Sequence, residues 1–153
     1  MRLVLATALL LGLWEGLALA GSGPARLSCE PRSGEKSTVS LKGLVPDSEE
    51  TLDVTLSDGT GSIRMTDEDA DVYRVEALEQ GVFSIIINRR KVNGEITLYA
   101  IPRTVKAKKR THSTHATFDA VMTAPNPQRQ GPVRSALDML QGLKMSCTYD
   151  YEI

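Results

Sequence analysis

The sequence has few cysteines, few aromatic residues and, after its first 20 residues, no long hydrophobic run. Its 153 residues include two cysteines and one tryptophan, Trp14, and aromatic residues make up 5% of the chain. Two cysteines are too few for a disulfide-dense scaffold. Because no second apolar run reaches about 20 residues, we expect residues 21–153 to contain no membrane span.

Motifs of catalysis and of metal binding are also missing. The chain contains no Gly-x-Ser-x-Gly and no His-Glu-x-x-His sequence. The two histidines, His112 and His115, are three residues apart, which would put them on opposite faces of a strand. We therefore predict no catalytic residue, no metal ligand and no cofactor, and we expect that the protein is not an enzyme.

One acidic stretch has the spacing of a calcium loop without its other requirements. Asp67, Asp69 and Asp71 match the first, third and fifth positions of an EF-hand loop. That loop also needs a glycine at its sixth position and a bidentate glutamate at its twelfth, which here are Val72 and Leu78. We expect a turn with solvated carboxylates.

The first 20 residues predict a secretory signal peptide. Arg2 precedes a leucine-rich run, and Ala18 and Ala20 form a small-x-small cleavage motif. Cleavage after Ala20 would leave residues 21–153 as a single secreted domain without tryptophan. We expect an extracellular protein with no nucleic-acid partner.

Cys29 and Cys147 lie near the two ends of that domain. In an oxidising compartment two cysteines without a third candidate are expected to pair. The alternatives are two free buried thiols or an intermolecular bridge. In the chain-entropy model an intramolecular bridge over so long a loop stabilises the fold by up to about 4 to 5 kcal/mol.

Period-two alternation of apolar and polar residues predicts a succession of short strands. Leu52, Val54 and Leu56 share one face of such a strand, and the turn sequence SDGTG joins it to a second strand that ends near residue 66. Residues 82–90 are β-branched and aromatic, which predicts a central strand buried on both faces. The remaining strands are predicted at residues 38–44, 71–78, 95–101 and 115–123.

A short helix is predicted before the last strand. Pro132 suits the first turn of a helix, and Val133, Leu137 and Leu140 recur at i, i+4 and i+7. Residues 145–153 then alternate again, with Cys147 on the apolar face. We expect this strand to place Cys147 against a Cys29 that lies on or near the first strand.

Together these elements predict an all-β fold, either one antiparallel β-sandwich or a small closed β-barrel, with one short C-terminal helix before the last strand. The segment FSIIINRRKVNGEITLYA, residues 83–100, resembles the middle of a lipocalin, and the predicted helix and last strand resemble its C-terminal half. This resemblance implies a barrel that carries a small apolar ligand. Residues 21–153 lack the Gly-x-Trp signature of lipocalins, so we assign the chain to no family.

Charge is distributed unevenly, although the net charge is only −1. Residues 30–79 carry 13 acids against 5 bases, whereas residues 80–110 carry 8 bases against 1 acid. Most of these bases form two groups on either side of the predicted strand 95–101, which we expect at opposite ends of it unless the chain folds back after Pro102. The groups are Arg89, Arg90 and Lys91, and Lys106, Lys108, Lys109 and Arg110.

Cations grouped in this way bind sulfate and phosphate. We predict a secreted, non-enzymatic binding module that engages a sulfated glycan or an extracellular protein through its basic residues 89–110. The alternative is a barrel that carries a small apolar ligand in a cavity lined by aliphatic side chains with Phe83, Phe118 and a few tyrosines. Two simpler interpretations of the basic groups are solubilising loops and, at Lys109-Arg110, a dibasic processing site.

Overall fold

The computed structural model describes residues 24–46, 51–129 and 131–152, and the predicted signal peptide lies outside these ranges. Within them, no helix is long and apolar enough to cross a membrane. The chain forms strands joined by turns and two single-turn 3-10 helices. In chain order these are β1 (Ala25–Pro31), β2 (Ser40–Val45), β3 (Asp53–Ser57), β4 (Ser62–Thr66), β5 (Ala70–Ala77), η1 (Leu78–Gln80), β6 (Val82–Arg89), β7 (Glu95–Ala100), β8 (Lys106–Arg110), β9 (Ser113–Pro125), η2 (Ala136–Asp138) and β10 (Met139–Glu152).

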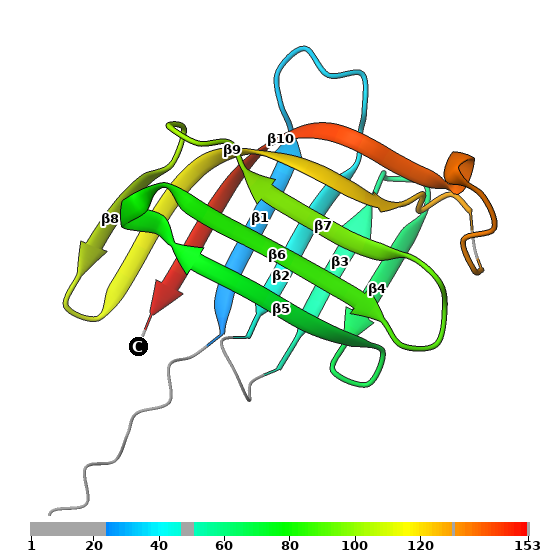
Figure 1. The fold of residues 1–153 in the computed structure, drawn as a ribbon, viewed down its shortest axis with the longest axis horizontal. Helices are drawn as coiled ribbons and strands as arrows, with labels where there is room; N and C mark the ends of the chain where they lie inside the picture. Colours follow the sequence, from blue (N-terminus) through cyan, green and yellow to red (C-terminus); the bar gives the residue numbers. More distant parts are fainter. Residues whose placement is uncertain (1–23, 47–50, 130, 153) are drawn as a thin grey trace, which may run out of the picture.

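All the strands belong to one antiparallel sheet that curls until it nearly closes. The strand order is β4-β3-β2-β1-β10-β9-β7-β6-β5, and β8 pairs with β9 off this path. In Figure 1, β5, β6 and β7 form a front layer and β1 to β4 form the layer behind it, while the long strands β9 and β10 join the two layers. The predicted all-β antiparallel domain is confirmed. Its two layers resemble a sandwich, and its continuous sheet resembles a barrel.

The core lies between the two layers because alternate residues of every long strand point inward. In β1 and β10, for example, Leu27, Cys29, Met145, Cys147 and Tyr149 are buried. Cys29 lies directly opposite Cys147 in the β1–β10 ladder, and the two form a disulfide bond. This confirms the predicted pairing and the predicted last strand.

The predicted helix before the last strand is wrong. Only η2 is helical there, and β10 already begins at Met139, where it pairs with the end of β9. Val133, Leu137 and Leu140 do not form a buried helical face, since Leu137 is 81% exposed. β10 has a β-bulge between Leu140 and Leu143, with Gly142 at φ 65°. Because the bulge adds a residue, Leu140 and Leu143 both pack against the core although they are three apart.

Two further differences concern β6 and β8. β6 is not buried on both faces, because Phe83, Ile85 and Ile87 point into the core while Val82 is exposed on the outer face. Residues 106–110, which the sequence suggested were a loop, form β8 and pair with β9. β8 has no apolar alternation to reveal it, since its one small apolar residue is Ala107.

Candidate functional site

The two basic groups lie in different parts of the sheet. Arg89 ends β6, and Arg90 and Lys91 follow it close to the start of β7. β8 carries the second group and pairs with residues 113–117 of β9, whereas β7 pairs with residues 120–123. At about 3.3 Å per residue, the six residues from Thr123 to Thr117 alone correspond to roughly 20 Å. The expectation that the groups lie at opposite ends of β7 is confirmed.

In the first basic group the two arginines have acidic neighbours, whereas Lys91 is exposed and has no acidic partner among the described residues. Arg90 donates from Nε and Nη2 to Oδ1 of Asp71, at 3.0 and 2.6 Å. This hydrogen bond lowers the pKa of Asp71 and raises the pKa of Arg90. Arg89 is partly buried, and desolvation lowers its pKa while the charge of Asp69 acts in the opposite direction. We infer that both arginines mainly stabilise the end of the sheet where β5 pairs with β6.

The second group is different, because its side chains have no acidic partner within the described part of the chain. In β8, Ala107 lies opposite the buried Ala116, so Lys106, Lys108 and Arg110 point outward. Alternate residues of a strand are about 6.6 Å apart, so these three cations form an evenly spaced row. Lys109 points to the other side, where it lines a small depression with Glu76 and Glu79.

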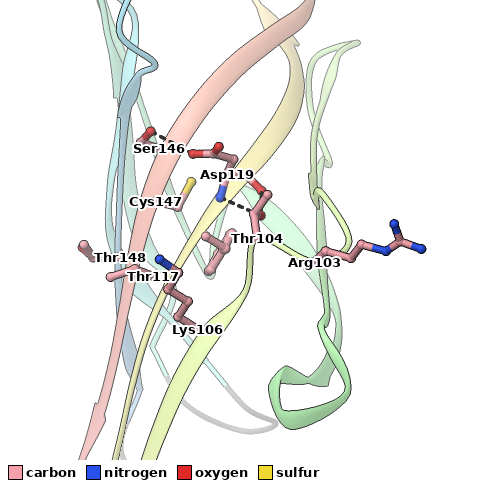
Figure 2. A pocket seen from close by; sticks show the side chains of 9 residues that line it. Arg103, Thr104, Lys106, Thr117, Asp119, Ser146, Cys147 and Thr148 are labelled. Carbon is pink, nitrogen blue, oxygen red and sulfur yellow. Dashed lines mark hydrogen bonds between the residues drawn. The ribbon is translucent and has the colours of Figure 1, made fainter.

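The row begins at a surface groove of about 530 Å³ on the outer side of β9 and β10 (Figure 2). Hydroxyl groups of Thr117, Ser146 and Thr148 line it together with Lys106. Its other lining residues are Arg103, Thr104, Phe118, Asp119 and Cys147. The groove therefore offers several hydrogen-bond donors beside the first cation of β8.

A turn between β7 and β8 forms one wall of the groove. The backbone N–H of Thr104 donates to the carbonyl of Ile101 at 3.2 Å, and Arg103 has a φ of 70°. With Pro102 before it, Arg103 occupies the third position of a type II turn, where glycine is usual. Thr104 Oγ1 accepts a hydrogen bond from the backbone N–H of Asp119 at 3.0 Å, which fixes the turn to β9 (Figure 2). The Arg103 side chain extends away from Asp119 toward solvent.

Asp119 supplies the one acidic group in the groove lining. Ser146 Oγ donates to its Oδ1 at 3.1 Å, and Arg32 Nε lies 3.5 Å from its Oδ2. The negative charge of Asp119 is thus balanced by Arg32, which is not one of the residues that line the groove. This leaves the β8 side of the groove basic and rich in donors, an arrangement suited to sulfate, phosphate or carboxylate groups.

A partly buried polar cluster that the sequence did not reveal lies on the inner side of the sheet. Tyr149 donates from its hydroxyl to Glu76 Oε2 at 2.6 Å and accepts from Arg74 Nη1 at 3.2 Å. The Arg74 side chain is only 8% exposed. Tyr149 is 75 positions from Arg74 and 73 positions from Glu76, so no local pattern could have indicated the contacts.

The side chains considered for metal binding have protein partners. Asp67 accepts a hydrogen bond from the backbone N–H of Leu52 at 2.6 Å, and Asp69 accepts one from Thr66 Oγ1 at 3.1 Å. His115 pairs with Asp150 on the outer face of β9 and β10. Among the described residues, no three His, Cys, Asp or Glu side chains are grouped so that they could hold a metal ion.

The geometry of the sheet and of its surface is the basis for assigning a function. The chain matches no known protein-family model, no curated protein and no solved structure. The features that bear on function are therefore the unpaired row on β8, the groove beside it and the composition of the two outer faces.

Proposed function

We propose that the protein is a secreted, non-enzymatic binding module that engages a sulfated glycan through Lys106, Lys108 and Arg110. The single observation that carries this proposal is the outward row of three cations on β8, which has no acidic partner in the described residues. Secretion is the expectation from residues 1–20, and the Cys29–Cys147 disulfide is compatible with it.

The proposed surface is smaller than the basic residues 89–110 considered from the sequence. Arg90 is bound to Asp71, and Arg89 is partly buried, so neither is available as a freely exposed cation, and the exposed Lys91 is left as a single cation at that end of the sheet. Lys109 lies on the Glu76 and Glu79 side of β8. The outer row is accompanied by Ser113, His115 and Thr117 of β9, whose polar side chains can add hydrogen bonds to sulfate oxygens.

Heparin-affinity chromatography tests the proposal with two variants of equal net charge. The test variant carries Lys106→Gln, Lys108→Gln and Arg110→Gln. The control carries Lys42→Gln, Arg64→Gln and Arg90→Gln, which removes three cations that are paired with Glu30, Asp53 and Asp71. We expect the test variant to elute at a much lower salt concentration than the parent and the control to stay close to the parent, because unpaired cations contribute most to binding.

Equal loss of retention in both variants would mean that only net charge matters, and unchanged retention in the test variant would contradict the proposal. Lys109→Gln alone is a further control within β8. It should have little effect, because this side chain faces away from the row.

The second candidate is a barrel that carries a small apolar ligand, which the nearly closed sheet favours. Three aromatic rings pack against one another in part of the interior. The ring centre of Phe83 lies 5.0 Å from that of Phe118 and 5.4 Å from that of Tyr149. This packing makes the outer surface the better candidate. Native mass spectrometry of the secreted protein distinguishes the two, because a carrier retains a small molecule that is released on denaturation.

A further inference from the structure

One outer face of the sheet has an uncharged centre. It is formed by β5, β6, β7 and the adjoining part of β9, where outward residues line up in rows across the strands. Tyr73 and Val75 are 62% and 59% exposed, and Tyr99 is 48% exposed. The two central rows are Tyr73, Ile86, Thr97 and Thr123, and Val75, Ser84, Tyr99 and Val121.

The opposite outer face, on β1 to β4, β10 and the adjoining part of β9, has the composition of a solvated sheet surface. It carries ion pairs between neighbouring strands: Glu30 with Lys42, Asp53 with Arg64, and His115 with Asp150. An antiparallel sheet that faces water on one side normally has polar residues there. The uncharged face instead combines tyrosines with an absence of charge, which is typical of the centre of a protein–protein interface.

The size of this uncharged face suits the centre of a dimer interface. Strands spaced about 4.8 Å apart and rows about 6.6 Å apart give the two rows, with Val82 beyond them, an area of roughly 250 to 300 Å². A stable interface buries about 800 Å² on each partner, of which a polar rim forms the outer part. The uncharged face therefore supplies about a third of the area that one subunit needs, as the centre of the interface, and the polar rim around it supplies the rest.

We propose that a second copy of this chain covers the uncharged face. A two-fold axis parallel to the strands, between β6 and β7, would place β5 over β9 and β6 over β7 of the second copy. Each row then contacts the same row of the second copy, and the contacts are self-complementary. Between the two copies, Tyr73 meets Thr123, Ile86 meets Thr97, Tyr99 meets Ser84, and Val75 meets Val121. A larger side chain faces a smaller one at three of these four contacts, as two sheets that interdigitate about 10 Å apart require.

This proposal is independent of the proposed glycan site. β8 pairs with residues 113–117 of β9, whereas the uncharged face includes only residues 121 and 123 of that strand. Loss of dimerisation and loss of heparin binding should therefore result from different substitutions.

Sedimentation equilibrium of the mature, disulfide-bonded protein tests the interface. We expect a mass twice that of one chain at micromolar concentration. Tyr99→Glu puts a carboxylate in the centre of the uncharged face and should weaken dimerisation by at least about 30-fold, the size of effect seen for central interface residues. Thr55→Glu is the matched control, because it places the same charge on the outer face of β3, between Lys42 and Arg64, and should leave the dimer intact.

Thermal unfolding of both variants checks that they are folded. If Tyr99→Glu is not folded, Tyr99→Thr repeats the test, because it is a milder change to another strand-forming residue. A monomer at all concentrations up to several hundred micromolar would overturn the proposal, even if another protein were found on this face. A dimer that survives both substitutions at position 99, or that Thr55→Glu disrupts equally, would overturn it too.

Discussion

Asp58 shows how one side chain determines a turn. Its Oδ1 accepts hydrogen bonds from the backbone N–H groups of Gly61 and Thr60, at 2.7 and 2.9 Å, and from Thr60 Oγ1 at 3.0 Å. These bonds favour the ionised carboxyl and lower the pKa of Asp58 from 3.8 to about 2, with the Gly61 N–H as the largest cause. The sequence SDGTG predicted the turn because aspartate is suited to such contacts.

A pH titration of stability tests this role. Because the folded-state pKa is the lower one, the contribution of Asp58 is fully present above pH 4 and is lost as the pH falls toward 2. We expect the free energy of unfolding, measured with urea between pH 2 and 5, to fall less steeply in Asp58→Asn than in the parent. Glu35→Gln removes a carboxylate that directly follows another turn, residues 33–34, and makes none of these turn contacts, so this variant is the control. Identical profiles for all three proteins would contradict the assignment.

Arg103 is the other residue whose backbone is informative. It has a positive φ in a turn where glycine would be less strained, and its side chain extends into solvent beside the groove. Among the described residues it is the only non-glycine with a positive φ. Strain of this kind is often kept where a side chain has a function, which agrees with a binding surface in this part of the sheet.

At the scale of single elements, Gly43 in β2 and Gly142 in β10 illustrate two reasons for glycine. Both have positive φ angles, 146° and 65°. A Cβ on Gly43 would lie 2.0 Å from the backbone oxygen of Asp53 in the neighbouring β3, whereas a Cβ on Gly142 would have no neighbour within 4 Å. The first glycine allows close approach of two strands, and the second only allows the bulge.

These differences predict unequal effects of the same substitution. Gly142→Ala should lower the free energy of unfolding by about 1 to 2 kcal/mol, the cost of a left-handed conformation. Gly43→Ala adds a clash with backbone atoms and should lower it by roughly 2 to 5 kcal/mol. Urea denaturation of the two variants measures the difference, and equal effects would mean that β2 and β3 can separate locally without cost.

The strands could be predicted from the sequence where alternate residues point into one core. Leu52, Val54 and Leu56 are all buried in the structure, and the predicted strands near them were found. The bulge at Gly142 could not be predicted, because it gives Leu140 and Leu143 the spacing of a helix. β8 could not be predicted either, since its stability comes from its hydrogen bonds to β9 and not from apolar side chains.

The candidate site was predictable in its residue types but not in its extent. The sequence identified the cations of both basic groups, but it could not show that Asp71 neutralises Arg90, because that contact depends on the pairing of β5 with β6. The direction of each lysine also depends on the register of β8 against β9. The uncharged face has the same origin, since Tyr73 and Tyr99 come to lie on one face only through the pairing of β5, β6 and β7.

At the scale of the whole molecule, the disulfide joins β1 to β10 across a separation of 118 residues. Replacing both Cys29 and Cys147 by Ala should lower the free energy of unfolding by up to about 5 kcal/mol, because the unfolded chain regains the freedom that the closed loop removes. Urea unfolding with and without a reductant measures this. The parent should be sensitive to reductant and the variant insensitive. A change below about 1 kcal/mol would contradict this account.

The two proposals together describe a bivalent molecule. A dimer that buries the uncharged face would leave the β8 row of each subunit exposed, because β8 lies beyond the interface along β9. Two such rows can bind one long polyanion at once, and binding of the first raises the effective concentration of the second. A monomeric Tyr99→Thr variant, in which no charge is changed, should therefore keep the heparin binding of a single β8 row but elute at a lower salt concentration than the dimeric parent.

The pairing of β1 with β10 also affects the order in which the protein is completed on the ribosome. β1 is the first strand to be made, yet one of its two neighbours is the last. At about 5 to 20 residues per second, the 118 residues between the cysteines require roughly 6 to 24 s of translation. During that interval the Cys29 thiol waits without its partner, and one edge of β1 has no strand to pair with. Formation of the Cys29–Cys147 disulfide, in which both thiols give up their electrons to an oxidant of the secretory compartment, is thus tied to the end of synthesis, and β1 pairs with β10 only when the whole chain has emerged.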